Sequence, residues 1–236
     1  MDNKKVLIAG GSGFIGQKLA SLLIDKGFDV STLTRKPKNS KDIFWNPITR
    51  EINLSQLSEI DVLVNCAGMQ VVSPLDKYPE ETWRKLMDIN LNAAFYMTKY
   101  TLPIMRKNKW GRIINISSTH GLIASINKSA YTASKHGIVG LTKVTALETA
   151  KEKITCNSIC PGFVLTEFIQ DQIDVIAKKF KLSDAKAQIK LLQDKQPSLR
   201  FVQKSHIADL IYFLCSDSAS EITGANIPID GGWTSQ

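Results

Sequence analysis

A tyrosine and a lysine four residues apart, Tyr131 and Lys135, have the types and spacing for acid–base chemistry. Residues 131–151 form an amphipathic segment that predicts a helix, and side chains four residues apart lie on one face of a helix. An ammonium group beside a phenol lowers the pKa of the phenol, so Tyr131 could accept a proton from an alcohol or return one to a carbonyl. Ser118 ends a predicted strand, where its hydroxyl could hydrogen-bond the substrate oxygen. Each of these residues alone could have an ordinary structural role, as an exposed tyrosine, a solvated lysine or a serine in a turn. Their occurrence together favours a catalytic group.

A glycine-rich loop near the start of the chain could bind phosphate. Gly10, Gly13 and Gly16 follow an apolar segment, residues 4–10, and open a segment of helical spacing, residues 14–27. The first glycine permits a tight turn, the second lets the backbone approach a pyrophosphate, and the third lets the helix pack closely on the strand. The free N–H groups of the helix then face the phosphates. The pattern predicts a dinucleotide site rather than only a tight turn, with contacts from Gly10, Ser12, Gly13, Phe14, Ile15 and Gly16.

The end of the second predicted strand, residues 28–34, bears on the choice of cofactor. An NAD enzyme would carry Asp or Glu here for the adenosine ribose, whereas this chain has Thr34, Arg35 and Lys36. A hydroxyl and two cations suit a 2′-phosphate. We therefore expect NADP(H) to be favoured, with Thr34 and Arg35 as contacts. The alternative is that Arg35 and Lys36 are solvent-facing loop charges.

The elements that must position these residues alternate along the chain, which predicts a parallel sheet covered by helices on both faces. We expect seven strands, at residues 4–10, 28–34, 42–46, 61–66, 111–118, 154–160 and 226–229. We expect helices at residues 14–27, 79–108, 131–151, 164–180, 183–196 and 205–216. Residues 46–60 are too few for a full crossover helix, so one helix should be curtailed there. The predicted fold is a doubly wound α/β sheet of the Rossmann type, with seven parallel strands in the order 3-2-1-4-5-6-7 and the site at their carboxyl ends.

The composition excludes several classes of protein. The 236 residues are 43% hydrophobic and 22% charged, with no apolar run near the ~18 residues that span a bilayer, so we expect a soluble globular protein and no membrane partner. The formal charge of +8 is spread without a basic arm, which favours an anionic ligand over nucleic acid. Four cysteines without Cys-x-x-Cys spacing predict buried thiols and no metal site. The first residues leave no room for a signal peptide, which predicts a cytoplasmic protein.

Five landmarks resemble those of the short-chain dehydrogenase/reductase family and occur in its order: Asn65-Cys66-Ala67-Gly68, Asn90, Ser118, Tyr131 with Lys135, and Pro161-Gly162. The resemblance implies that Ser118, Tyr131 and Lys135 are catalytic and that Lys135 also binds the nicotinamide ribose. It implies that the helix is distorted at Asn90 and that this distortion lets Asn90 hold a water molecule of a proton relay. It implies further cofactor contacts from Asn65, Ala67, Gly68, Tyr131, Lys135, Pro161, Gly162, Val164 and Thr166. It also implies a homotetramer whose dimer faces are the helices at residues 79–108 and 131–151.

From about residue 66 to residue 236 the chain resembles one group of that family, the D-β-hydroxybutyrate dehydrogenases. This implies reversible oxidation of D-3-hydroxybutyrate to acetoacetate, so the expected partner is a small anionic hydroxy or keto acid. The residues implied for the substrate are Gln70, His120, Lys128 and Gln172 around its carboxylate and Trp233 closing over it, beside Ser118 and Tyr131. One ammonium would supply charge, while two amides and an imidazole would supply direction. The lysine-rich segment after Pro161-Gly162 matches the mobile substrate lid of the family.

Residues 1–65 depart from that group and resemble an epimerase-like branch of the same superfamily, in which Phe14 stands where dehydrogenases usually have glycine. The chain thus resembles a hybrid with a seam near residues 61–66 that is not a domain boundary, and we expect one catalytic domain over residues 1–236. The dehydrogenase group's acidic contact to adenine is replaced by Asn46. That group's preference for NAD(H) is the alternative to NADP(H).

Two other functions stay open from the sequence. One keeps the chemistry but changes the substrate to another 3-oxo compound or an acyl thioester. The other is a regulator that senses NADPH without turnover, for which the intact set Asn90, Ser118, Tyr131 and Lys135 would be superfluous. Tight cofactor binding without turnover at any pH would indicate the regulator. Nucleic-acid binding ranks behind both.

Overall fold

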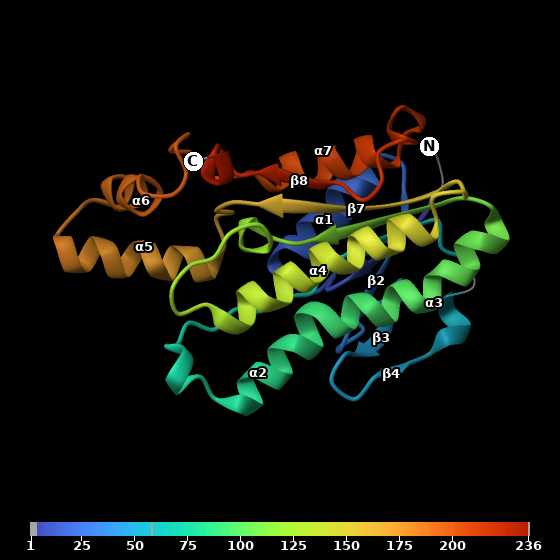
Figure 1. The fold of residues 1–236 in the computed structure, drawn as a ribbon, viewed down its shortest axis with the longest axis horizontal. Helices are drawn as coiled ribbons and strands as arrows, with labels where there is room; N and C mark the ends of the chain where they lie inside the picture. Colours follow the sequence, from blue (N-terminus) through green and yellow to red (C-terminus); the bar gives the residue numbers. More distant parts are fainter. Residues whose placement is uncertain (1–3, 58, 236) are drawn as a thin grey trace.

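The computed structural model describes residues 4–57 and 59–235, and its central element is an eight-stranded sheet (Figure 1). The strands are β1 (Lys5–Ala9), β2 (Asp29–Thr34), β3 (Asp42–Asn46), β4 (Glu51–Ile52), β5 (Val62–Asn65), β6 (Gly111–Ile116), β7 (Ile154–Pro161) and β8 (Asn226–Ile229). Their order is β4-β3-β2-β1-β5-β6-β7-β8. The expected absence of a signal peptide rests partly on residues 1–3, which lie outside the described residues.

The seven predicted strands all form, and their predicted order is confirmed. These seven strands all pair in parallel, as expected. The structure adds an eighth strand that was not predicted, β4, which pairs antiparallel with β3 at one edge. A strand of two residues has no alternation of apolar and polar side chains, so its sequence carries no strand signal. The expected shortening of the crossover in residues 46–60 is confirmed, because a 3-10 helix, Leu54–Leu57, stands there within the described residues.

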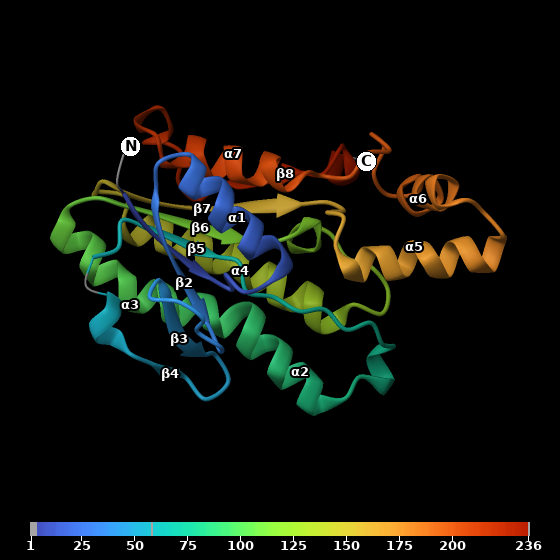
Figure 2. The same ribbon diagram turned by 180° about the vertical axis from the view of Figure 1, so that it is seen from behind.

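Helices cover both faces of the sheet, as predicted (Figures 1 and 2). They are α1 (Phe14–Asp25), α2 (Glu80–Met87), α3 (Ala93–Asn108), α4 (Ser129–Glu148), α5 (Glu167–Phe180), α6 (Asp184–Leu192) and α7 (Lys204–Cys215). α1 and α7 lie on one face, and α2, α3 and α4 lie on the other. The single helix expected over residues 79–108 is divided into α2 and α3 by a π-helical turn, Asp88–Asn92. The expected helix distortion at Asn90 is therefore confirmed.

Alternating strand residues build a hydrophobic layer on each face. On β1, Val6 and Ile8 belong to the layer that includes Leu19 of α1. Leu7, between them, belongs to the opposite layer, which includes Met97 of α3. A parallel sheet must be apolar on both faces, and this alternation buries both. The packed layers hold the carboxyl ends of β1, β5, β6 and β7 in fixed positions.

The carboxyl ends of the strands point towards α5 and α6, which project beyond the sheet as a pair of packed helices (Figures 1 and 2). β6 ends at Ile116, earlier than the expected residue 118, so Ser118 lies in the connection that follows. There the Ser118 hydroxyl accepts a hydrogen bond from the His120 N–H and caps a 3-10 helix, Thr119–Gly121. In the described part of the chain, no helix is both long and apolar enough to cross a membrane.

Candidate active site

Two adjoining cavities open beside the carboxyl ends of the strands. The first, which we call the Tyr131 cavity, has a volume of about 430 Å³. The second, the glycine-loop cavity, has a volume of about 520 Å³. They share Ile15, Cys66, Gly68, Met69 and Thr166. One extended ligand can therefore occupy both.

Most of the predicted site residues line one of these cavities. The Tyr131 cavity is lined by Gln70, Ser118, His120, Lys128, Tyr131, Lys135, Pro161, Gly162, Val164, Thr166, Gln172 and Trp233. The glycine-loop cavity is lined by Gly10, Ser12, Gly13, Phe14, Ile15, Gly16, Thr34, Arg35, Ala67 and Gly68. Two predicted residues, Asn65 and Asn90, line neither and lie buried behind them.

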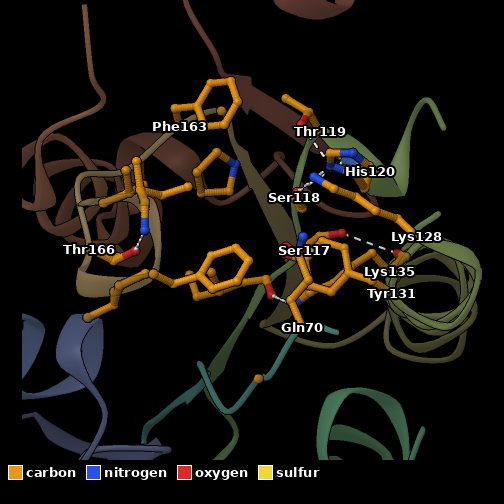
Figure 3. Close-up of a pocket in the computed structure, with 18 of the residues that line it drawn as sticks. Gln70, Ser117, Ser118, Thr119, His120, Lys128, Tyr131, Lys135, Phe163 and Thr166 are labelled. Carbon is orange, nitrogen blue, oxygen red and sulfur yellow. Dashed lines mark hydrogen bonds between the residues drawn. The ribbon is translucent and has the colours of Figure 1, made fainter. Parts of the chain in front are cut away.

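Ser118, Tyr131 and Lys135 converge on one wall of the Tyr131 cavity (Figure 3). Tyr131 and Lys135 both come from the first turns of α4, while Ser118 comes from the connection after β6. The Lys135 ammonium donates to the Ile116 carbonyl oxygen at 2.8 Å and lies 5.7 Å from the Tyr131 ring centroid. The Tyr131 side chain also hydrogen-bonds that of Ser118. The helix spacing thus brings a phenol, a hydroxyl and an ammonium together, as expected.

The pKa of Tyr131 differs from the expected direction. Burial raises the pKa of its phenol, and the hydrogen bond with Ser118 opposes the rise only in part. The Lys135 ammonium donates its hydrogen bond to the Ile116 carbonyl and not to the phenol. Burial lowers the pKa of Lys135 to about 8. In this arrangement Tyr131 holds its proton, which suits it to donate that proton to a carbonyl. To act as a base in the other direction, the phenol needs a further positive charge beside it.

His120 forms a neutral, oriented part of the same wall. Burial, followed by the nearby charges of Lys128, Lys195 and His136, lowers its pKa to about 3. Its Nε2 lies 3.0 Å from the Ser125 hydroxyl, and its Nδ1 lies 3.5 Å from that of Ser118. The imidazole contributes hydrogen bonding without charge.

Lys128 and Gln70 supply polar groups to the cavity from two separate loops (Figure 3). Burial, together with the charge of Lys195, lowers the pKa of Lys128 to about 8. The Gln70 Nε2 is buried and has no hydrogen-bond partner. Since a buried amide donor without a partner costs free energy, this group fits a ligand oxygen in the cavity.

The lid side of the cavity comes from α5 and the C-terminal segment. Trp233 stacks on Phe163, with ring centroids 4.9 Å apart, and meets His120 edge-on at 5.6 Å. Gln172 of α5 lines the cavity, but its amide donates to the Phe168 carbonyl of its own helix at 3.3 Å. Trp233 is thus packed in place, whereas one amide N–H of Gln172 is engaged within its own helix.

Asn90 and Asn65 are buried behind the loop between the two cavities, and Asn90 is hydrogen-bonded to that loop. Asn90 Oδ1 accepts from the Met69 N–H at 2.8 Å, and its Nδ2 donates to the Met69 carbonyl at 2.9 Å. Asn65 donates to Asn115 across adjacent strands at 2.8 Å. The two Asn90 hydrogen bonds position Met69, which lines both cavities, whereas Asn65 ties β5 to β6. The water-holding role of Asn90 and the direct cofactor contact of Asn65 stay predictions.

The glycine loop has the geometry that a dinucleotide requires. Gly10 has a φ of +90°, and a Cβ on it would lie 2.6 Å from the Ala67 nitrogen. A Cβ on Gly16 would collide with the Gly10 carbonyl oxygen. α1 begins at Phe14 with Gly13 as its N-cap, and its first turn has neither a side-chain cap nor an acidic residue. Its first N–H groups are therefore open to a phosphate, so these residues fit a pyrophosphate group.

The far end of the glycine-loop cavity is basic and apolar. Thr34 is buried and Arg35 exposed, and both line it, but Lys36 does not and only donates its backbone N–H to the Thr34 hydroxyl. No acidic side chain occurs among the described lining residues. The sequence interpretation missed Trp45, whose indole nitrogen is buried without a partner, and Ile48. The sequence signal for Trp45 was its place next to Asn46, which stands at the position expected to contact adenine.

Comparison with known proteins agrees with this geometry. Residues 48–234 match a family described as enoyl-(acyl carrier protein) reductase. The chain is 48% identical over 182 residues to a D-beta-hydroxybutyrate dehydrogenase of Cupriavidus necator, covering 77% of this chain and 70% of the relative. A variant of the actinorhodin polyketide ketoreductase, solved with NADPH, superposes with a TM-score of 0.86 and 25% identity, covering 100% of both chains.

A short-chain dehydrogenase family protein from Francisella tularensis superposes with a TM-score of 0.81 and 28% identity, covering 99% of this chain and 100% of the other. This chain combines three features: a mainly parallel sheet, the glycine loop, and the pair formed by Tyr131 and Lys135. This protein is an NAD(P)-dependent oxidoreductase that belongs to the short-chain dehydrogenase/reductase family.

Proposed function

We propose that the protein interconverts D-3-hydroxybutyrate and acetoacetate. The observation that carries this proposal is the set of polar groups that line the Tyr131 cavity beside Ser118 and Tyr131. Lys128, the unpartnered amide of Gln70 and the neutral His120 lie there, and the described lining residues include no Asp or Glu. Such a set suits one carboxylate of a small hydroxy acid.

In the oxidative direction, the C3–H bond of the substrate breaks and its electron pair leaves with the hydrogen as hydride. The nicotinamide ring supplies the acceptor for that hydride. The alcohol proton passes to Tyr131, and the C–O bond becomes a carbonyl. Ser118 holds the substrate oxygen, and Lys135 holds the nicotinamide ribose and keeps positive charge near the phenol. Asn90 holds the water that exchanges the proton with solvent.

The carboxylate then lies at the other end of the substrate. Lys128 gives it a charged partner, and Gln70 and His120 give it hydrogen bonds. Gln172 joins them with its amide, one N–H of which donates to the Phe168 carbonyl. Trp233 closes the cavity over the short carbon chain. These polar groups reject a neutral group in place of the carboxylate because their own hydrogen bonds would then be lost.

For the cofactor we propose a preference for NADP(H) over NAD(H). Arg35 lies at the rim of the glycine-loop cavity and Thr34 in its wall, with no acidic side chain among the described lining residues to bind free ribose hydroxyls. An exposed guanidinium there can bind a 2′-phosphate in a fork. The other proposed contacts are those given for the glycine loop, Asn65, Ala67, Gly68, and the segment from Pro161 to Thr166.

The test is the absorbance of reduced nicotinamide with D- and L-3-hydroxybutyrate, each offered with NAD⁺ and with NADP⁺. We expect turnover with the D isomer, faster with NADP⁺. No oxidation of the D isomer with either cofactor would contradict the substrate assignment. Faster turnover with NAD⁺ would contradict only the cofactor assignment.

One alternative is favoured by a specific finding, because the chain is 30% identical to a 3-oxoacyl-[acyl-carrier-protein] reductase of Staphylococcus aureus. The protein would then reduce a 3-oxo acyl thioester with the same Tyr131 chemistry. Acetoacetyl thioester and acetoacetate compared as substrates distinguish the two. A NADPH-sensing regulator would turn over neither.

We also propose that the protein is one domain over residues 1–236 and assembles as a homotetramer. A continuous sheet joins strands from Lys5 to Ile229, which supports the single domain. Phe95 of α3 and Val144 and Leu147 of α4 are exposed apolar residues on the two helices expected at the dimer face. Light scattering after size-exclusion chromatography measures the mass, and a monomer would contradict the tetramer.

A further inference from the structure

A buried glutamine, Gln196, contacts the wall that Phe163 and Trp233 form in the Tyr131 cavity. The rings of these two residues stack with their centroids 4.9 Å apart, and both residues line the cavity (Figure 3). Gln196 is fully buried and is not among the lining residues. It can therefore act on a ligand in the cavity only through the wall.

The side-chain amide of Gln196 fixes the backbone of Phe163 to the segment that follows α6. Its Oε1 accepts the Phe163 N–H at 2.9 Å, and its Nε2 donates to the Arg200 carbonyl oxygen. The Phe163 carbonyl oxygen in turn accepts the Val202 N–H at 2.8 Å. Because a buried backbone group without a partner costs free energy, Phe163 cannot move away from this segment alone.

The C-terminal segment is joined at the same place. The Ser198 N–H donates to the Gly231 carbonyl at 3.0 Å, and the Gly162 N–H donates to the Ile229 carbonyl at 2.9 Å. A Cβ on Gly162 would collide with the Gln196 Oε1, and a Cβ on Gly231 would lie 3.0 Å from the Gln196 Cγ. The glutamine side chain thus lies between two segments that approach it so closely that each has a glycine there.

A small apolar cluster joins the same three parts of the chain. Phe163, Leu192 and Trp233 form a buried cluster apart from the two layers on the faces of the sheet. They come from the segment after β7, from α6 and from the C-terminal segment. Apolar contact has no preferred direction, whereas a hydrogen bond has a fixed geometry. The Gln196 amide therefore selects one arrangement of a cluster that apolar contact alone would leave loose.

We propose that Gln196 is a positioning residue for the oxidoreductase reaction. It keeps the stack of Phe163 and Trp233 assembled before the substrate arrives. One amide does this by accepting a hydrogen bond from one segment and donating a hydrogen bond within another. The role applies to the reaction of the family, whichever hydroxy or oxo compound is the substrate.

Loss of this amide should change KM and leave kcat. A wall that visits several arrangements binds substrate only in the assembled one, so the apparent affinity falls by the assembled fraction. Once the substrate is bound the wall is assembled, and the reacting groups are placed as in the wild type. Partial unfolding has the opposite signature, because it lowers the amount of active enzyme and leaves KM unchanged. The split between KM and kcat thus separates positioning from a merely structural role.

The experiment measures steady-state kinetics of Gln196→Met, which is similar in volume and removes both hydrogen bonds. The substrate is the one that the wild type turns over, D-3-hydroxybutyrate or the acetoacetyl thioester. We expect KM to rise about tenfold and kcat to stay within about twofold, as for a wall assembled roughly one tenth of the time. Gln196→Asn keeps an amide that is one methylene too short to reach both partners. It should shift KM in the same direction, and it keeps the test decisive if Gln196→Met does not fold.

Asn157→Leu is the matched control, because Asn157 is also a fully buried amide that joins backbone segments. Its Oδ1 accepts the Ala225 N–H at 3.0 Å and its Nδ2 donates to the Ile222 carbonyl at 2.6 Å, but it lines neither cavity. This variant should lose stability and keep the wild-type KM. Equal rises of KM in Asn157→Leu and Gln196→Met would overturn the proposal and indicate general destabilisation. An unchanged KM in both Gln196 variants would overturn it as well.

Hydrogen exchange of the protein without substrate keeps the inference separate from the proposed function. Mass spectrometry should show exchange about tenfold faster in Gln196→Met over residues 162–164 and 229–235, and unchanged exchange in the glycine loop. In Asn157→Leu the acceleration should be confined to residues near 222–225. Wild-type exchange over residues 162–164 in Gln196→Met would refute the positioning role. If the wild type turned over neither substrate, the proposed function would fail and this difference in exchange alone would decide the role of Gln196.

Discussion

Tyr131 depends on its neighbours for its direction of proton transfer. Burial raises the pKa of its phenol and keeps it protonated, and the Ser118 hydroxyl only partly offsets this. The phenol is thus prepared to donate a proton to a carbonyl, and oxidation of an alcohol needs the added positive charge of the oxidised nicotinamide ring. Oxidation should consequently rise with pH over the range in which the phenol loses its proton.

Tyr131→Phe removes the proton carrier and leaves the ring packing. Turnover should fall by ~10²–10⁴, the usual contribution of general acid–base catalysis, while the affinity for NADP(H) stays nearly unchanged. Steady-state rates and a fluorescence titration of NADPH measure the two effects. Activity within a few-fold of the wild type would eliminate Tyr131 as the acid–base group.

Lys128 should give the acid substrate a pH dependence that a neutral ester lacks. Its pKa is lowered to about 8, so the ammonium that pairs with a carboxylate disappears as the pH rises above that value. We expect kcat/KM to fall above pH 8 more steeply for 3-hydroxybutyrate than for its ester. Lys128→Ala should lower kcat/KM for the acid about ten- to a hundredfold at neutral pH and the ester much less. Parallel profiles for the two substrates would exclude Lys128 from carboxylate binding.

At the scale of elements, the connection after β2 decides the cofactor. Arg35 is exposed at the rim of the glycine-loop cavity, where a 2′-phosphate of a bound dinucleotide would add charged hydrogen bonds. Arg35→Ala should narrow the difference between NADP(H) and NAD(H) binding by about 1–3 kcal/mol. Calorimetric titration of both cofactors measures it. Lys36→Ala is the control, because Lys36 does not line that cavity, and an equal effect of both variants would show general charge attraction only.

The sequence predicted elements well where a signal extends over several residues. Buried strands and long amphipathic helices have that signal, and so does the glycine loop with its fixed spacing. The two-residue β4 has none, and the end of β6 at Ile116 depends on a hydrogen bond that Ser118 accepts beyond the strand. The stack of Phe163 on Trp233 brings the segment after β7 against the C-terminal segment. No local pattern in the sequence encodes that contact.

For the candidate site, residue types could be predicted but their electrostatics could not. The chemistry of Tyr131 and Lys135 follows from helix spacing, whereas their pKa directions depend on burial and on the Ile116 carbonyl. Trp45 also escaped prediction, because an aromatic residue beside Asn46 indicates a ligand contact only once β3 is known to end at the cavity. Burial and long-range contacts are properties of the packed chain.

At the scale of the whole molecule, the buried Lys135 costs stability. Its folded-state pKa is about 8, below its ordinary value of 10.5, so the unfolded chain binds this proton more tightly. The free energy of unfolding should therefore rise as the pH increases from 8 towards 10.5, with Lys128 contributing in the same sense.

Lys135→Met should remove this cost and increase the free energy of unfolding by about 1–3 kcal/mol at neutral pH, while it abolishes most of the turnover. Urea unfolding monitored by circular dichroism measures the change. The rise in stability between pH 8 and 10.5 should also shrink in this variant. A less stable Lys135→Met would mean that the hydrogen bond to Ile116 outweighs the desolvation of the ammonium.

Helix α5, which covers the Tyr131 cavity, begins where the two cavities meet. Thr166 lines both cavities, and its hydroxyl accepts the Ile169 N–H at 3.3 Å as the N-cap of α5. A dinucleotide that reaches Thr166 would steady the base of α5 before a small acid arrives beneath it. The two reactants should consequently bind in a compulsory order, dinucleotide first. Product inhibition should then be competitive between oxidised and reduced dinucleotide, and non-competitive between acetoacetate and the oxidised dinucleotide.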